Sequence, residues 1–216
     1  MYIAIEGVIG VGKTTLARLL QPAFEADLLL EEFEENPFLA KFYDDRVRYA
    51  FQTQIFFLLS RYDQQRRNVP GALRSNHSLV TDYTFDKDAL FARINLSGDE
   101  LDTYDRLHEA LAEKIPLPDL VVYLRADTDV LMQRIAMRDR AYERNMERGY
   151  IDELNAAYES FYSAQRWKSR VLALDTNELD YVRNPESLLW VENRIRQALK
   201  LAPFQPELPL EFDSSS

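Results

Sequence analysis

The stretch Gly7–Thr14 reads GVIGVGKT and fits the pattern G-x-x-x-x-G-K-[ST]. It follows a short apolar segment, Tyr2–Glu6, and opens a segment of helical periodicity that runs to about Phe24. The backbone N–H groups of such a strand-to-helix turn can surround a phosphate, so the stretch predicts binding of a nucleoside triphosphate. Lys13 is expected to reach the γ-phosphate, and the hydroxyl of Thr14 to ligate Mg²⁺. The residues expected to bind nucleotide here are Gly7, Val8, Ile9, Gly10, Val11, Gly12, Lys13, Thr14 and Thr15.

The pattern beyond this stretch predicts an α/β fold. Strands that alternate with helices form a mainly parallel sheet covered on both faces, with ligands at the carboxyl ends of its strands. We expect a five-stranded parallel sheet flanked by helices within one domain, residues 1–200, followed by a proline-rich tail at 201–216. A long buried helix is expected over residues 46–67, before a turn at Pro70-Gly71. The later strands are expected at 28–31, 78–82, 120–124 and 171–174.

Composition narrows the class of protein. The chain has 216 residues, of which 46% are hydrophobic, and this is enough for one full core. Its formal charge of −10 disfavours nucleic-acid polymers and anionic membranes as partners. The absence of cysteine excludes disulfides, thiolate metal sites and a cysteine nucleophile, and two histidines are too few for a histidine-rich metal site. The N-terminus has no basic region and no apolar run approaches bilayer length, so we interpret the chain as cytoplasmic.

The phosphate-binding stretch leaves the acceptor of the phosphoryl group open. The N-K-x-D guanine motif of GTPases is absent from the sequence, and a motor or remodelling ATPase usually needs a longer chain. A small-molecule kinase needs a carboxylate for the metal, a base for the acceptor hydroxyl and cations over the transferred group. Asp82 ends the third expected strand, where a metal-binding carboxylate is expected. The alternative is that Asp82 caps the following helix or turn.

The cations are expected in the segment QRIAMRDR, where Arg134, Arg138 and Arg140 lie on or just beyond a helix. Arg134 and Arg138 are spaced i,i+4 and share one helix face. We expect this cluster to belong to a lid, at about residues 138–148, that closes over the phosphates and stabilises developing charge. The alternative is an ordinary solvated helix surface.

Several segments together resemble the deoxynucleoside kinases, and among them the bacterial deoxyguanosine and deoxyadenosine kinases. The resemblance covers residues 2–199 and rests on the phosphate-binding stretch together with EEFEENPFLAKFYDD, FQTQIFF, QRI…RDRAYE and ALDTNELD. It implies a P-loop kinase fold with an arginine-rich lid, ATP as phosphoryl donor, Mg²⁺ as cofactor and a small-molecule deoxynucleoside as acceptor. It also implies a homodimer, and a heterodimer with a related kinase subunit stays open.

The resemblance assigns roles to individual residues. Glu31 would be the general base for the 5′-hydroxyl, with a pKa that like charges and partial burial keep from falling too low. Tyr43 and Glu143 would bind the 3′-hydroxyl of the sugar. Gln52 would contact the edge of the acceptor base, and Asp88 would add a further polar contact. Phe91 would stack on the base, with packing in the core as the alternative. Asp175, Asn177 and Glu178 would lie against the adenine of ATP.

The sequence departs from the family pattern after the third strand. Many members have Asp or Glu followed by Arg and Ser, where this chain has Asp82-Tyr83-Thr84. Bacterial deoxyguanosine kinase-like sequences resemble this chain in having Asp-Tyr, which favours deoxyguanosine as acceptor and leaves deoxyadenosine open. Asp82 and Tyr83 are therefore expected beside the substrate, and Arg61 is a candidate for the missing cation.

These features favour an ATP- and Mg²⁺-dependent 5′-kinase of purine deoxynucleosides that serves nucleotide salvage. The residues expected to act in catalysis are Glu31, Lys13, Arg134, Arg138 and Arg140. A thymidylate-type or other nucleoside monophosphate kinase is the closest alternative, but it would need further cations for the phosphate of its acceptor. A non-catalytic nucleotide-binding regulator is the alternative from another class.

Overall fold

The computed structural model describes residues 1–74, 77–144, 146–164 and 170–203. The described residues form a five-stranded sheet in the order β2-β3-β1-β4-β5, and every neighbouring pair of strands is parallel. This confirms the five-stranded parallel sheet predicted from the sequence. The strands are β1 (Tyr2–Gly7), β2 (Ala26–Leu29), β3 (Ser78–Thr81), β4 (Leu120–Arg125) and β5 (Val171–Asp175).

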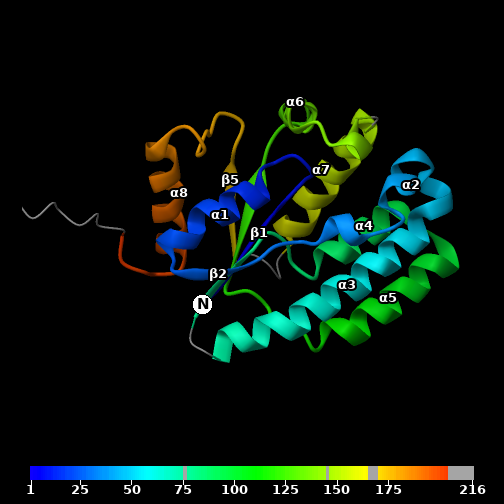
Figure 1. Ribbon diagram of the computed structural model, residues 1–216, viewed down its shortest axis with the longest axis horizontal. Helices are drawn as coiled ribbons and strands as arrows, with labels where there is room; N and C mark the ends of the chain where they lie inside the picture. The colour runs from blue at the N-terminus through cyan, green and yellow to red at the C-terminus, as the bar shows by residue number, and fades with distance from the viewer. Residues whose placement is uncertain (75–76, 145, 165–169, 204–216) are drawn as a thin grey trace, which may run out of the picture.

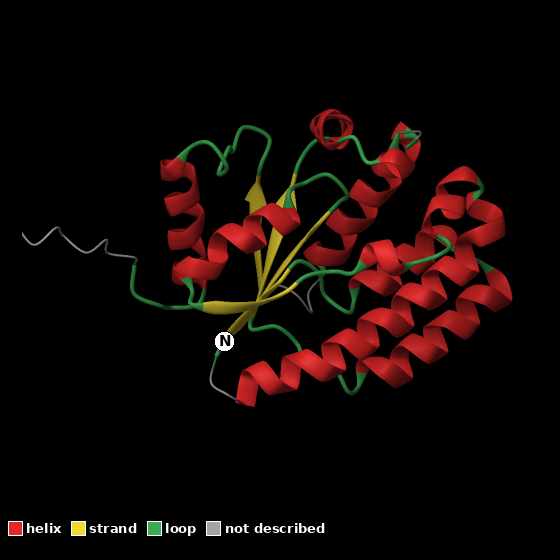
Figure 2. Cartoon of the chain, viewed as in Figure 1, coloured by secondary structure: helices red, strands yellow, loops and turns green. Residues whose placement is uncertain are grey.

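Helices cover the sheet on both faces (Figures 1 and 2). Helices α1 and α8 contact each other on one side, while α3, α4, α5 and α7 group on the other (Figure 1). All six residues of β1 are buried, as expected for the central strand of a sheet covered twice. The helices are α1 (Lys13–Ala23), α2 (Leu39–Asp44), α3 (Arg46–Arg74), α4 (Lys87–Asn95), α5 (Gly98–Ala112), α6 (Thr128–Arg138), α7 (Arg148–Ser163) and α8 (Pro185–Ala198), with the 3₁₀ turns η1 (Phe33–Glu35) and η2 (Ala141–Glu143).

Helix α3 is longer than the sequence pattern suggests. It continues to Arg74, through Pro70 and Gly71, so the turn expected there is wrong. Proline usually ends a helix because it lacks an N–H donor and crowds the preceding turn. Here Val69 is fully buried in a hydrophobic cluster that includes Tyr2 of β1, and this packing favours the continued helix.

The strand order brings the carboxyl ends of β1, β2, β3 and β4 to one edge of the sheet, where a ligand site is expected in such folds. Within the residues that the structure describes, no helix combines the length and apolarity needed to cross a bilayer. The tail predicted at 201–216 lies outside the described residues from residue 204 onward.

Candidate active site

The phosphate-binding stretch connects β1 to α1 and turns tightly. Gly10 and Gly12 have φ angles of 88° and 103°, in the left-handed region that favours glycine. A side chain at Gly12 would also collide with the hydroxyl of Tyr181. The Lys13 ammonium lies across the loop and donates to the carbonyl oxygen of Gly7 at 2.7 Å. The loop therefore has the shape of a phosphate-binding loop, and Lys13 lies where the loop opens to the cavity.

Thr14 and Asp82 come together at the edge of this loop. Asp82 follows β3 directly, and its Oδ2 accepts a hydrogen bond from the hydroxyl of Thr14. Its Oδ1 accepts from the backbone N–H of Glu31 at 2.8 Å. Hydroxyl and carboxylate oxygens fit Mg²⁺, which one or two carboxylates typically hold together with phosphate and water oxygens. In the described part of the chain, no group of three or more His, Cys, Asp or Glu side chains is placed to hold a metal on its own.

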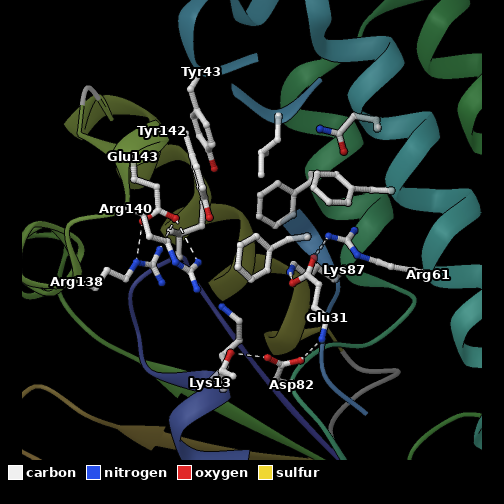
Figure 3. Close-up of a pocket in the computed structure, with 17 residues that line it drawn as sticks. Lys13, Glu31, Tyr43, Arg61, Asp82, Lys87, Arg138, Arg140, Tyr142 and Glu143 are labelled. Carbon is white, nitrogen blue, oxygen red and sulfur yellow. Dashed lines mark hydrogen bonds and ion pairs between the residues drawn. The ribbon is translucent and has the colours of Figure 1, made fainter. Parts of the chain in front are cut away.

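Glu31 lies two residues beyond the end of β2 and faces the cavity between the phosphate-binding loop and α3 (Figure 3). Its Oε1 contacts Arg61, and its Oε2 accepts from the Lys87 ammonium at 2.6 Å. Burial alone would raise the pKa of Glu31, but the charges of Arg61 and Lys87 outweigh it and hold the pKa well below the ordinary value. The expectation that the Glu31 pKa would be kept from falling too low is therefore wrong.

Two cations and two carboxylates form an ion-pair cluster beside this end of the cavity. Arg61 reaches from α3, and its second guanidinium nitrogen pairs with Asp88 of α4. Asp88 is fully buried behind Arg61 and does not line the cavity. Arg61 and Lys87 thus balance Glu31 and Asp88, so this cluster carries no net charge.

The glutamine that faces the cavity is Gln54 and not Gln52. Gln52 is on the exposed side of α3, whereas Gln54 is 2% exposed and lines the cavity with Arg61. Because a helix turns about 100° per residue, two positions along α3 move a side chain to the opposite face. Phe91 does line the cavity, as expected, and so does Phe57, which was not expected.

Tyr83 does not reach the cavity, although it was expected beside the substrate. It follows Asp82, and successive side chains along an extended chain point to opposite faces. Its ring is fully buried and its hydroxyl contacts Gln64 of α3. Gln64 in turn donates to the carbonyl oxygen of Leu30 at 2.8 Å. Tyr83 therefore supports the chain next to Glu31 from behind.

The segment after α6 forms the wall opposite Glu31 (Figure 3). Arg138 makes a bidentate pair with Glu143, with nitrogen–oxygen distances of 2.7 and 2.6 Å. Arg140 lies 3.7 Å from Glu143 and stacks its guanidinium over Phe33, 4.2 Å from the ring centroid. Arg138, Arg140 and Glu143 all line the cavity, and the closing of this segment as a lid stays a prediction.

Arg134 does not join them. Its guanidinium donates to the carbonyl oxygen of Thr176 at 2.5 Å and to that of Val11 at 3.4 Å. These carbonyl oxygens lie at the end of β5 and in the phosphate-binding loop, so Arg134 connects the two segments outside the cavity. Arg134 and Arg138 were expected to act together on one helix face. They point to different partners because Arg138, at the end of α6, pairs with Glu143.

Tyr43 lines the cavity next to Glu143, as expected, and stacks on Tyr142. Their ring centroids are 6.0 Å apart and the ring planes differ by 13°. Tyr142 comes from η2 and Tyr43 from α2, so this stack joins the segment after α6 to the helix that follows Glu31.

The residues expected against adenine lie in a separate, open hollow. Asp175, Asn177 and Glu178 line it together with Leu179, after β5. Asn177 is fixed there, because its side-chain oxygen accepts from the backbone N–H of Asp127 at 2.8 Å. Thr15, expected to bind nucleotide, is exposed on α1.

Sequence reasoning missed six residues of the main cavity: Phe33, Leu39, Gln54, Phe57, Lys87 and Tyr142. A signal for Gln54 exists, since it precedes Arg61 by seven residues and lies on the same helix face. For Lys87 the available signal was a lysine at the start of a helix, where a cation is unfavourable.

The chain is similar to known proteins in both sequence and structure. A sequence model of the family described as "Deoxynucleoside kinase" matches residues 3–200. The chain is 32% identical to the deoxyguanosine kinase of Bacillus subtilis (strain 168), over 92% of this chain and 97% of that protein. It is 31% identical to the deoxyadenosine/deoxycytidine kinase of the same organism, over 90% of each chain. Among solved structures, the deoxyadenosine kinase from M. mycoides with bound dCTP superposes with a TM-score of 0.78 at 27% identity, covering 91% of this chain and 100% of that one.

Proposed function

The chain belongs to the deoxynucleoside kinase family, and we propose that it transfers the γ-phosphoryl group of ATP to the 5′-hydroxyl of a purine deoxynucleoside. Deoxyguanosine is the favoured acceptor and deoxyadenosine the second. The observation that carries the proposal is the position of Glu31, between Asp82 at the phosphate-binding loop and the cavity lined by Gln54 and Phe91.

In the proposed reaction, the 5′-hydroxyl donates a hydrogen bond to the carboxylate of Glu31. The bond from the 5′-oxygen to the γ-phosphorus forms while the bond from that phosphorus to the bridging oxygen breaks, and ADP leaves with the electron pair. The proton of the hydroxyl passes to Glu31. Because its pKa is low, Glu31 is charged at neutral pH and accepts the proton only late, when the attacking hydroxyl has become acidic.

The other residues bind and orient the donor. Lys13 would reach the γ-phosphate from the loop, and the oxygens of Thr14 and Asp82 would hold Mg²⁺. Bound there, Mg²⁺ would offset the negative charge of the phosphates. Arg138 and Arg140 face the same space and bind the transferred group once Glu143 turns to the 3′-hydroxyl of the sugar.

Charge balance supports a neutral acceptor over a nucleoside monophosphate. Arg61 and Lys87, the cations on the acceptor side, already pair with Glu31 and Asp88. A phosphate on the acceptor would approach Glu31 with no spare cation in this cluster, and like charges at such distances repel strongly. A deoxynucleoside brings no charge to the same place.

The choice of a purine rests on resemblance to deoxyguanosine kinases, and the reading of the base on two residues of the cavity. Asp82-Tyr83 resembles deoxyguanosine kinase-like sequences, and the deoxyguanosine kinase of Bacillus subtilis is 32% identical to this chain. Gln54 offers an amide donor and an acceptor to the edge of the base, and Phe91 offers a stacking face. The proposed role is nucleotide salvage by a cytoplasmic enzyme. Exposed Val47 and Leu59 on α3 provide apolar surface for the homodimer expected from the family.

The proposal is tested by incubating the protein with Mg²⁺, ATP labelled at the γ-phosphate and deoxyguanosine. The expected product is labelled deoxyguanosine 5′-monophosphate, identified against the 3′-isomer by chromatography. Chelation of Mg²⁺ and the variant Lys13→Ala are each expected to abolish transfer. Label that appears only as inorganic phosphate, or on the 3′-position, would contradict the proposal.

A further inference from the structure

Lys87 occupies an unfavourable place for a lysine. It is the first residue of α4 and only 6% of it is exposed. A buried ammonium is costly unless it is paired, and a cation in the first turn of a helix opposes the helix dipole. Residues that break such local rules are typical of functional sites, because the rest of the structure must offset their cost.

The partner of Lys87 is Glu31, at 2.6 Å (Figure 3). Each oxygen of the Glu31 carboxylate has its own cation, Oε1 the guanidinium of Arg61 and Oε2 the ammonium of Lys87. Arg61 divides its charge between Glu31 and Asp88. Among the ion pairs of the described residues, Lys87 takes part only in the pair with Glu31.

Glu31 is thus held at both ends. Its backbone N–H donates to the carboxylate of Asp82, beside the loop, and its side chain is held from the opposite direction by Lys87 and Arg61. A carboxylate with two distinct partners has a fixed plane, and this plane decides which oxygen is turned to the acceptor hydroxyl. Without Lys87, Oε2 would be free to turn toward Arg61, whose fork can bind both oxygens.

We propose that Lys87 is a positioning residue of phosphoryl transfer, which fixes the carboxylate of Glu31 in the orientation that accepts the 5′-hydroxyl. The inference rests on the proposed function of this site. Lys87 acts through Glu31, so its effect belongs to the chemical step and depends on the charge of Glu31. A merely structural lysine would instead affect folding or the binding of both substrates.

The test is a double-mutant cycle on kcat with Lys87→Met, Glu31→Gln and the two changes together, measured with deoxyguanosine and ATP. Lys87→Met keeps the length of the side chain and removes its charge. A misplaced reacting group costs about 100-fold in rate, so we expect Lys87→Met to lower kcat by about that factor while KM changes less than about threefold. In the Glu31→Gln background the same change is expected to cost less than about threefold. Lys87→Arg is expected to recover most of the lost kcat.

Arg93→Met is the matched control, because it removes an exposed cation from the same helix. It is expected to leave kcat unchanged. Thermal unfolding of each variant shows whether it is folded, and Lys87→Gln replaces Lys87→Met if the latter unfolds.

An equal loss of kcat from Lys87→Met in both backgrounds would overturn the inference, since Lys87 would then act independently of Glu31. Unchanged kcat in Lys87→Met would also overturn it. If the wild-type protein itself transfers no phosphate to deoxynucleosides, the proposed function fails and the inference falls with it. An active wild type with an additive cycle overturns the inference alone.

Discussion

The proposed contact between Gln54 and the acceptor base gives a sharp prediction. Gln54 lies seven residues before Arg61, two helical turns away on the same face of α3, and Gln52 lies about 200° around the helix from Gln54. An amide that makes two hydrogen bonds to the base contributes about 1 kcal/mol for each, so Gln54→Leu should lose about 2 kcal/mol of transition-state binding. At 1.36 kcal/mol per tenfold change, this is about a 30-fold fall in kcat/KM for deoxyguanosine.

Gln52→Leu is the matched control, because it makes the same chemical change on the exposed side of the same helix. Its kcat/KM for deoxyguanosine should stay within about twofold of the wild type. Steady-state kinetics at saturating ATP measures both variants, and their KM for ATP should not change. A larger loss for Gln52→Leu than for Gln54→Leu would refute the orientation of α3 on which the site is built.

Three further predictions concern the ionisable side chains of Glu31, Lys13 and Glu6. Glu31→Gln should lower kcat about 100-fold, the usual contribution of a general base, while equilibrium dialysis still detects bound deoxyguanosine; wild-type kcat would contradict this. Burial and the charge of Lys87 lower the pKa of Lys13 to about 8. Because the ammonium form binds phosphate and exists below the pKa, kcat/KM for ATP should fall as pH rises through about 8; no fall before about pH 10.4, the value of an ordinary lysine, would refute it. Glu6 is fully buried and accepts from Thr84 N–H at 2.6 Å and Thr84 Oγ at 2.9 Å. Glu6→Ala should therefore lower the free energy of unfolding by about 3 kcal/mol in urea titrations, and a loss below about 1 kcal/mol would contradict that role.

The sequence predicted the phosphate-binding loop and the parallel sheet, because both depend on residues close together in the chain or on a regular pattern. The phosphate-binding stretch is contiguous, and its glycines, lysine and threonine have fixed positions relative to each other, so Lys13 and Thr14 could be placed directly. The sheet followed from alternating strands and helices, and the end of β3 brought Asp82 to Thr14. Parallel strands meet at one edge, which makes such long-range contacts predictable.

Features that depend on packing between distant segments were harder to predict from the sequence. The segment FQTQ offers two glutamines, and choosing Gln54 required knowing that Arg61, seven residues later, faces the same cavity. The continuation of α3 through Pro70 depends on Val69 in a distant cluster. The low pKa of Glu31 depends on Arg61 and Lys87, which lie 30 and 56 residues away in the chain. Ion pairs between residues far apart in the chain cannot be predicted from local sequence spacing.

The measurement that tests the central claim most directly is a comparison of kcat/KM, with Mg²⁺ and ATP, across a panel of acceptors. The panel contains deoxyguanosine, deoxyadenosine, deoxycytidine, thymidine, dGMP and dTMP. We predict that deoxyguanosine leads, deoxyadenosine follows and both monophosphates are inert, because Arg61 and Lys87 beside Glu31 are already paired with Glu31 and Asp88. Turnover of a monophosphate in preference to every deoxynucleoside would contradict the account and would assign Glu31 a role other than that of the base.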